Sequence, residues 1–272
     1  MKQHHLRFTL LLLLIGICSN THSQDSIPAH DSLNLNSVLV GEIRTINVWT
    51  PPGYAQSTDA YPVMYMPDGG IKEDFPHIAN TMADLINNGS IPPMILVGIE
   101  NTQRRSDLTG PTEVKKDKKI APVVGGSEKF RACISEELFP EINKRYRTTD
   151  AKGIIGESVA GLFIVETFFI KPDMFDYYIA MDPSLWWNDH ELVRNAEDYL
   201  AKMQSSTKRL WFAGSSEKGI SKRTKELSAI LESEKPAHII WKYSDEPGEQ
   251  HSTIYRATKE KALVWMFSGK TD

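Results

Sequence analysis

The first third of the chain combines period-two alternation with short apolar runs, the pattern typical of β-strands. Residues 33–42 and 44–50 alternate between apolar and polar positions and are separated near Gly41. This pattern predicts two antiparallel strands joined as a hairpin. Residues 61–66 and 93–99 are nearly continuous apolar runs, which indicates strands that are buried on both faces.

Helical spacing of apolar residues appears between and after these runs. Residues 75–88 carry apolar side chains three and four positions apart, and apolar side chains recur every four residues from Phe130 to Tyr146. Both segments are predicted helices, the second with a kink at Pro140. Further predicted strands end at Glu157 and span 177–181, 209–213 and 238–243, and further predicted helices span 162–170, 191–203, 220–231 and 252–267.

Strands that alternate with helices predict a mainly parallel sheet with helices on both faces, preceded here by the antiparallel hairpin. No internal repeat and no linker-like composition interrupts residues 33–268. We therefore expect one α/β domain over residues 24–272. Residues 100–127 lack a clear period and are too long for an ordinary connection, which indicates a functional segment or a mobile flap.

The first 23 residues are predicted to be a secretory signal, with a basic start and an apolar core over residues 8–18 that is too short to span a bilayer. Cleavage before Gln24 would give an exported protein, periplasmic or secreted. The alternative is a lipoprotein signal with Cys18 as the lipidated residue. It is disfavoured because bulky Ile17 stands where a small residue is needed.

Composition narrows the classes of function. The chain has 272 residues and a net charge of −4. A mildly acidic chain argues against a protein that binds nucleic acids or anionic membranes in general. No later apolar run approaches the ~20 residues of a membrane span. Metal-binding and phosphate-binding motifs are absent, so no metal or other cofactor is expected. Cys133, on an apolar helical face, is expected to be buried, and the oligomeric state stays open.

Residues 156–161 read Gly-Glu-Ser-Val-Ala-Gly and follow an apolar run. The pattern predicts a strand, a sharp turn and a helix, with the Ser158 hydroxyl raised above the sheet as a nucleophile. The usual pattern, G-x-S-x-G, has glycine where Ala160 stands. Ser158 could instead only cap the helix.

Polar residues that follow parallel strands gather at one edge of the sheet. Ser158 and His251 follow two such strands, and acids follow strands between them, in the order serine, acid, histidine of α/β-hydrolases. His251 would take the proton of Ser158, and a carboxylate would orient the imidazole. We expect Glu217 to be the acid, with Asp182 as the first alternative. Asp245, Glu249 or no acid at all are the remaining possibilities.

The same chemistry needs donors for an oxyanion and walls for a substrate. The backbone N–H of Val159 is one expected donor, and Gly70, slightly preferred over Gly69, is the other unless these glycines form only a turn. Trp186 and Trp187 could wall a pocket, although at least one of them is expected in the core. The lysine-rich residues 115–119 either steer an anionic substrate or form a solvated flap tip.

Taken in order, these segments resemble the putative esterase family of α/β-hydrolases, in the branch of enterochelin and other siderophore esterases. The matching segments are 44–54, 61–69, 97–109, 126–130, the Ser158 turn, 183–187 and 251–253. The resemblance implies a serine esterase with Ser158 as nucleophile and His251 as base. It supports Glu217 as the acid, and it implies that Arg104 and the Trp186 loop border the substrate cleft.

Three positions depart from the pattern of that family. Glu157 stands where histidine is frequent, Ala160 where glycine is frequent, and Asp182 where serine is common. Because the family includes esterases of siderophores, carbohydrates and simple acyl groups, the resemblance does not fix the substrate. We expect an esterase that acts on a small-molecule ester through an acyl-enzyme. The alternatives are an acyltransferase on the same fold and a non-catalytic ligand-binding domain.

Overall fold

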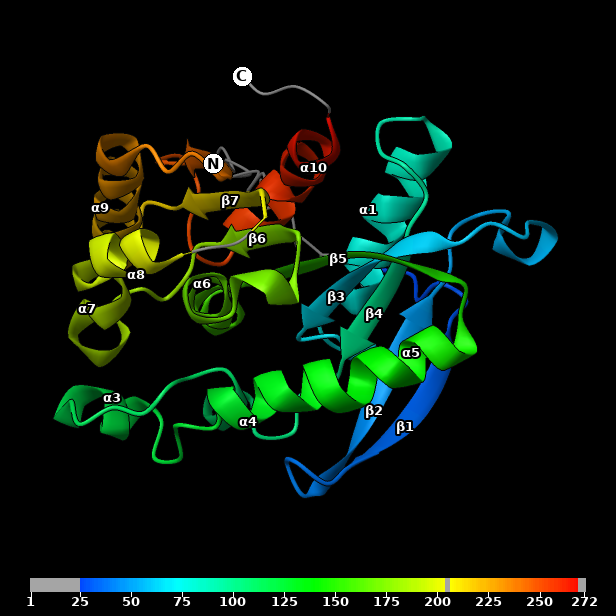
Figure 1. Ribbon diagram of the computed structural model, residues 1–272, viewed down its shortest axis with the longest axis horizontal. Helices are drawn as coiled ribbons and strands as arrows, with labels where there is room; N and C mark the ends of the chain where they lie inside the picture. Colours follow the sequence, from blue (N-terminus) through cyan, green and yellow to red (C-terminus); the bar gives the residue numbers. More distant parts are fainter. Residues whose placement is uncertain (1–24, 204–205, 269–272) are drawn as a thin grey trace, which may run out of the picture.

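A computed structural model of the protein describes residues 25–203 and 206–268. The predicted signal and Cys18 lie outside these residues. Eight strands form one sheet in the order β1-β2-β4-β3-β5-β6-β7-β8 (Figure 1). The strands are β1 (Asp31–Ser37), β2 (Glu42–Trp49), β3 (Tyr61–Pro67), β4 (Ile95–Ile99), β5 (Thr148–Glu157), β6 (Tyr177–Met181), β7 (Lys208–Gly214) and β8 (Ile239–Asp245).

The direction of pairing changes once along the sheet. β1 and β2 form the predicted antiparallel hairpin, and β2 pairs antiparallel with β4. Every later pairing, from β4 through β3 and β5 to β8, is parallel. This confirms the predicted α/β fold with an N-terminal antiparallel hairpin, and it brings the carboxyl ends of the parallel strands to one edge.

Helices cover both faces of the sheet (Figure 1). Helices α1 (Phe75–Asn87) and α10 (Ile254–Phe267) pack on one face. The other face carries α4 (Ser127–Ala132), the π-helical segment η2 (Cys133–Leu138), α5 (Phe139–Arg145), α6 (Val159–Ile170), α8 (Ala196–Lys202) and α9 (Lys218–Glu234). Alternate strand residues serve the two cores. In β6, Tyr178 and Ala180 face one core and Ile179 and Met181 face the other.

Two predicted helices differ in detail. The helix around Pro140 runs through α4, η2 and α5, and the wider π turn lies directly before the proline, where an α-helical hydrogen bond would be lost. Cys133 in η2 is buried, as expected. The segment predicted as one helix over 191–203 is two helices, α7 (Trp187–Arg194) and α8. Asn195, which lies between them, departs from helical backbone geometry.

The long connection after β4 contacts the segment around α7. It contains α2 (Arg104–Asp107) and α3 (Lys115–Ile120), and it leads into α4. The short 3₁₀ segments η1 (Tyr54–Gln56) and η3 (Pro172–Met174) complete the elements. Across the described residues, no helix combines the length and apolar character needed to cross a bilayer.

Candidate active site

Ser158 lies at the turn between β5 and α6, with φ 59° and ψ −115°. This backbone conformation is costly for a residue other than glycine, and the neighbours hold it in place. The Ser158 N–H donates to the carbonyl of Met181 at 2.9 Å. A Cβ atom at Gly156 would lie 2.8 Å from that of Ala160, so a glycine at 156 makes room for the alanine. The departure at Ala160 is therefore accommodated by its neighbour.

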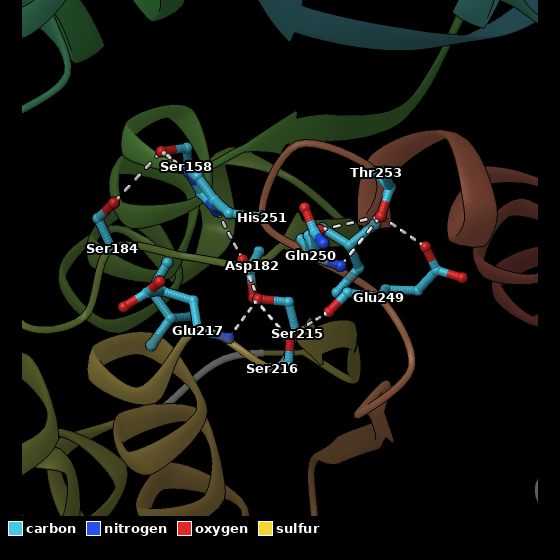
Figure 2. A network of polar contacts seen from close by, with 12 residues as sticks. Ser158, Asp182, Ser184, Ser215, Ser216, Glu217, Glu249, Gln250, His251 and Thr253 are labelled. Atoms are coloured by element: carbon cyan, nitrogen blue, oxygen red, sulfur yellow. Dashed lines mark hydrogen bonds and ion pairs between the residues drawn. The ribbon is translucent and has the colours of Figure 1, made fainter. Parts of the chain in front are cut away.

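A continuous chain of polar contacts runs from Ser158 through His251 to Asp182 (Figure 2). His251 Nε2 lies 3.0 Å from Ser158 Oγ, and His251 Nδ1 lies 2.6 Å from Asp182 Oδ2. Asp182 directly follows β6, and His251 lies in the loop between β8 and α10. The three side chains thus come from the same sheet edge, in the geometry of a serine–histidine–acid triad.

Asp182 is fully buried and held by a second pair of hydrogen bonds. The Ser215 N–H donates to Asp182 Oδ1 at 2.6 Å, and the Ser215 hydroxyl donates to Oδ2 at 2.8 Å. These bonds satisfy a carboxylate that burial would otherwise penalise. Ser215 was not among the residues expected at the site, although its position after β7 was a signal that could have included it.

The structure corrects the choice of acid. Glu217, the expected partner of His251, occupies the N-cap position of α9 without a side-chain capping bond. It follows β7, one strand farther from Ser158 than the strand that Asp182 follows, and its backbone N–H donates to Ser215 Oγ. Among the described residues, the Glu217 carboxylate has no hydrogen bond to the imidazole, and it lines the pocket in front of the triad instead (Figure 2). The alternative, Asp182, makes the contact.

The surroundings of His251 favour its protonated form. The hydrogen bond to Asp182 raises the pKa of His251 above its ordinary value, against a smaller opposing effect of burial, and the Glu157 carboxylate adds to the increase. Glu157 itself is partly buried and directly precedes Ser158. Burial raises the pKa of Glu157 to about 7, although the positive charge of His251 acts in the opposite direction.

The two expected oxyanion donors differ in their surroundings. Val159 is the first residue of α6, where a backbone N–H has no partner within the helix, and it lines the pocket beside Ser158. The Gly70 N–H donates to Glu73 Oε2 at 2.7 Å, and Gly70 is not among the residues that line the pocket. In this conformation Gly70 is therefore not available as the second donor.

A pocket of about 390 Å³ opens in front of Ser158 and His251. The three expected substrate-contacting residues, Arg104, Trp186 and Trp187, all line it. Arg104 is fixed by a two-bond ion pair with Asp68, with Nε–Oδ1 at 2.6 Å and Nη2–Oδ2 at 2.7 Å. Trp187 is 7% exposed and belongs to the core, as expected for one of the pair, whereas Trp186 is half-buried.

The donor set is that of acyl chemistry. Within residues 25–203 and 206–268, no cluster of three or more histidine, cysteine or carboxylate side chains has the arrangement of a metal site. Ser158, His251 and Asp182 form one chain of contacts, and the Val159 N–H lies at the start of α6 beside them. This arrangement can activate a hydroxyl and stabilise a tetrahedral intermediate.

Comparison with known proteins places the chain in a family. The model of the family described as "Putative esterase" matches residues 37–258. This chain belongs to the putative esterase family. One curated relative is the ferri-bacillibactin esterase BesA of Bacillus subtilis. It is 31% identical to this chain over 172 residues, which cover 56% of each chain.

Two further likenesses fit the putative esterase family. The siderophore triacetylfusarinine C esterase of Aspergillus fumigatus is 33% identical over 104 residues, 37% of this chain and 34% of the relative. An IroE-like serine hydrolase from Shewanella oneidensis has a similar structure, with a TM-score of 0.82 and 26% identity over 88% of this chain and 80% of that chain. The matched regions span about half or less of the lengths of these curated relatives.

Proposed function

We propose that this protein hydrolyses carboxylic esters through an acyl-enzyme on Ser158. The observation that carries the proposal is the contact of His251 with both Ser158 Oγ and the buried Asp182 carboxylate. Membership of the putative esterase family supports the same chemistry. The positive φ of Ser158 is a second support, since strained backbone is concentrated at functional sites.

In the proposed reaction, Ser158 Oγ attacks the ester carbonyl while His251 Nε2 takes its proton. The imidazolium then gives that proton to the leaving alcohol, and the reverse sequence with water releases the acid. Asp182 keeps the proton on Nδ1 and stabilises the imidazolium, and Ser215 fixes the carboxylate that does so. The raised pKa of His251 agrees with this stabilisation.

The oxyanion would receive the N–H of Val159 and a second positive contribution from the pocket. Arg104 uses Nε and Nη2 on Asp68, which leaves Nη1 outside that pair, and it lines the same pocket as Ser158. The Arg104 guanidinium can therefore contact the substrate while it keeps its ion pair with Asp68. Gly70 could contribute only after its bond to Glu73 opens.

For the substrate, we propose an ester of the siderophore type. The named relatives are a ferri-bacillibactin esterase and a triacetylfusarinine C esterase. Trp186, Trp187 and Arg104 offer flat apolar surfaces and a cation, which suit an acyl group with an aromatic ring and polar substituents. Export, predicted from residues 1–23, remains part of the proposal, and the N-terminus of the protein recovered from each cell fraction tests it.

A fluorophosphonate probe tests the chemistry directly. Folded wild-type protein should be labelled on Ser158, and Ser158→Ala should abolish both labelling and turnover of short nitrophenyl esters. A screen with siderophore, feruloyl, acetyl-sugar and simple acyl esters tests the substrate. Added alcohols that divert the acyl group from water would favour an acyltransferase, and ligand binding by an unlabelled wild-type protein would favour a non-catalytic domain.

A further inference from the structure

Asp117 is a buried carboxylate within an otherwise exposed basic helix. Helix α3 begins with Lys-Lys-Asp-Lys-Lys, and all four lysines are exposed, whereas Asp117 is 2% exposed. A charged side chain is rarely buried unless it has defined partners. The lysines fit the expectation of a solvated flap tip, and the aspartate between them does not.

One of the two hydrogen-bond partners of Asp117 lies on a different part of the chain. The backbone N–H of Asn188 donates to Asp117 Oδ2 at 2.8 Å, and the Thr112 hydroxyl donates to the same oxygen at 3.1 Å. Asn188 is 71 residues away and belongs to the turn that begins α7. A second bond joins the same two segments, since Trp187 Nε1 donates to the carbonyl of Gly110 at 3.2 Å.

The turn that Asp117 holds has a strained backbone. Asn188, Asp189 and His190 have φ values of 49°, 50° and 52°, so three consecutive residues with side chains adopt the left-handed conformation. The left-handed conformation is unfavourable for any residue that carries a Cβ atom. The turn therefore needs support from outside, and the Asp117 carboxylate bonds to its first N–H.

Both joined segments supply the wall of the pocket in front of Ser158. Ile120 and Ala121, at the end of α3, and Trp186 and Trp187, before the turn, all line this pocket. Trp187 also lines a second pocket of about 490 Å³, so it borders both pockets. The turn that Asp117 contacts follows Trp187 directly in the chain.

We propose that Asp117 is a positioning residue that holds helix α3 and the turn after Trp187 together as one wall, and thereby sets selectivity for esters with a bulky aromatic acyl group. The selectivity rests on the proposed esterase function, whereas the joining of the two segments does not. A small acyl group reaches Ser158 without touching this wall. A large one needs the wall in place to gain its binding energy.

Hydrogen exchange tests the joining without a substrate. In Asp117→Ala, amides of residues 110–121 and of residues 186–194 should both exchange faster, while those of β5 and α6 keep wild-type rates. Asp117→Asn retains an acceptor oxygen, so its exchange rates in these two segments should lie between those of wild-type protein and Asp117→Ala. Glu113→Gln is the matched control, since it removes a carboxylate whose side chain is 96% exposed on the same segment. Unchanged exchange at 186–194 in folded Asp117→Ala would overturn the proposal.

Ester pairs test the selectivity. For Asp117→Ala we expect kcat/KM for nitrophenyl benzoate to fall about tenfold or more, mainly through KM, while nitrophenyl acetate changes less than about twofold. Asp117→Asn should restore most of the ratio, and Glu113→Gln should retain it. An equal fall for both esters, or an unchanged or higher ratio, would overturn the selectivity. If wild-type protein cleaves neither ester and resists fluorophosphonate, the proposed function fails while the exchange result still decides the joining.

Discussion

His251 Nδ1 lies 2.6 Å from Oδ2 of Asp182, and Asp182 follows the strand that pairs directly with the strand of Ser158. Asp182 and Ser158 therefore lie at the ends of neighbouring parallel strands, and the His251 imidazole bridges them. Glu217 follows the next strand and faces the substrate pocket. The Asp182 carboxylate thus bonds to the imidazole, whereas Glu217 lines the pocket.

The two carboxylates should respond differently to removal of their charge. Asp182→Asn keeps the shape but no longer stabilises the imidazolium or fixes its tautomer, so kcat should fall by roughly 10⁴. Glu217→Gln should lose less than about tenfold, because the imidazole keeps its partner. Steady-state kinetics on one nitrophenyl ester gives both values. A larger loss for Glu217→Gln than for Asp182→Asn would contradict the assignment.

Much of the fold was predictable because apolar periodicity is a local property of the chain. The hairpin, the parallel strands and the serine turn all left such a pattern, and His251 was identified by its place after the last strand. The acid could not be fixed this way. Asp182 and Glu217 both follow parallel strands, and only the three-dimensional path of the backbone, with φ 46° at Asp182, aims one of them at the imidazole.

Other features of the site depended on contacts between distant segments. The burial of Asp117 requires a partner 71 residues away, which no pattern within the lysine-rich helix reveals. The expected donor, the Gly70 N–H, is bonded to the carboxylate of Glu73, and no feature of the glycine turn itself indicates this bond. The left-handed turn after Trp187 contains no glycine, so the sequence does not indicate it. Hydrogen bonding to a distant segment supports the turn instead.

Glu157 should shift the pH dependence of activity. The reaction needs neutral His251, so kcat/KM should rise with pH through the pKa of His251, which lies above its ordinary value. Glu157→Gln removes one of the charges that raise this pKa, and the rising limb should therefore move to lower pH by a few tenths of a unit. The pH profile of kcat/KM measures the shift. The exposed Glu232→Gln on α9 is the control, and a limb that stays or moves upward contradicts the expectation.

The same carboxylate should also affect stability. Its pKa is about 7 in the folded protein against an ordinary 4.5, so the folded state binds more protons than the unfolded state between these values. Its contribution to stability is present below pH 4.5 and is lost as the pH rises through 7, on the order of 3 kcal/mol in all.

Denaturant unfolding at pH 5 and pH 8 checks this contribution. Wild-type protein and Glu232→Gln should show the same loss of unfolding free energy between the two pH values. Glu157→Gln should show a smaller loss, because its amide does not titrate. Equal pH dependence in all three proteins would mean that Glu157 is ionised at little cost in the folded state.

The serine turn should show coupling between Gly156 and Ala160. A methyl group added at Gly156 would lie 2.8 Å from the Ala160 Cβ, so Gly156→Ala alone should cost about 1–3 kcal/mol of stability through overpacking. Ala160→Gly alone should cost less than about 1 kcal/mol, because glycine is less favourable than alanine in a helix but Ala160 lies in the first turn of α6.

The double variant should be more stable than the sum of these losses implies, since the two methyl groups no longer meet. Ile164 Cδ1, 3.3 Å from the added group, lies at the end of a flexible side chain and can move by the small amount required. Unfolding free energies of the four proteins give the coupling energy, and we expect it to be favourable by at least about 1 kcal/mol. Additive losses would mean that the backbone of the turn, and not this contact, requires glycine at position 156.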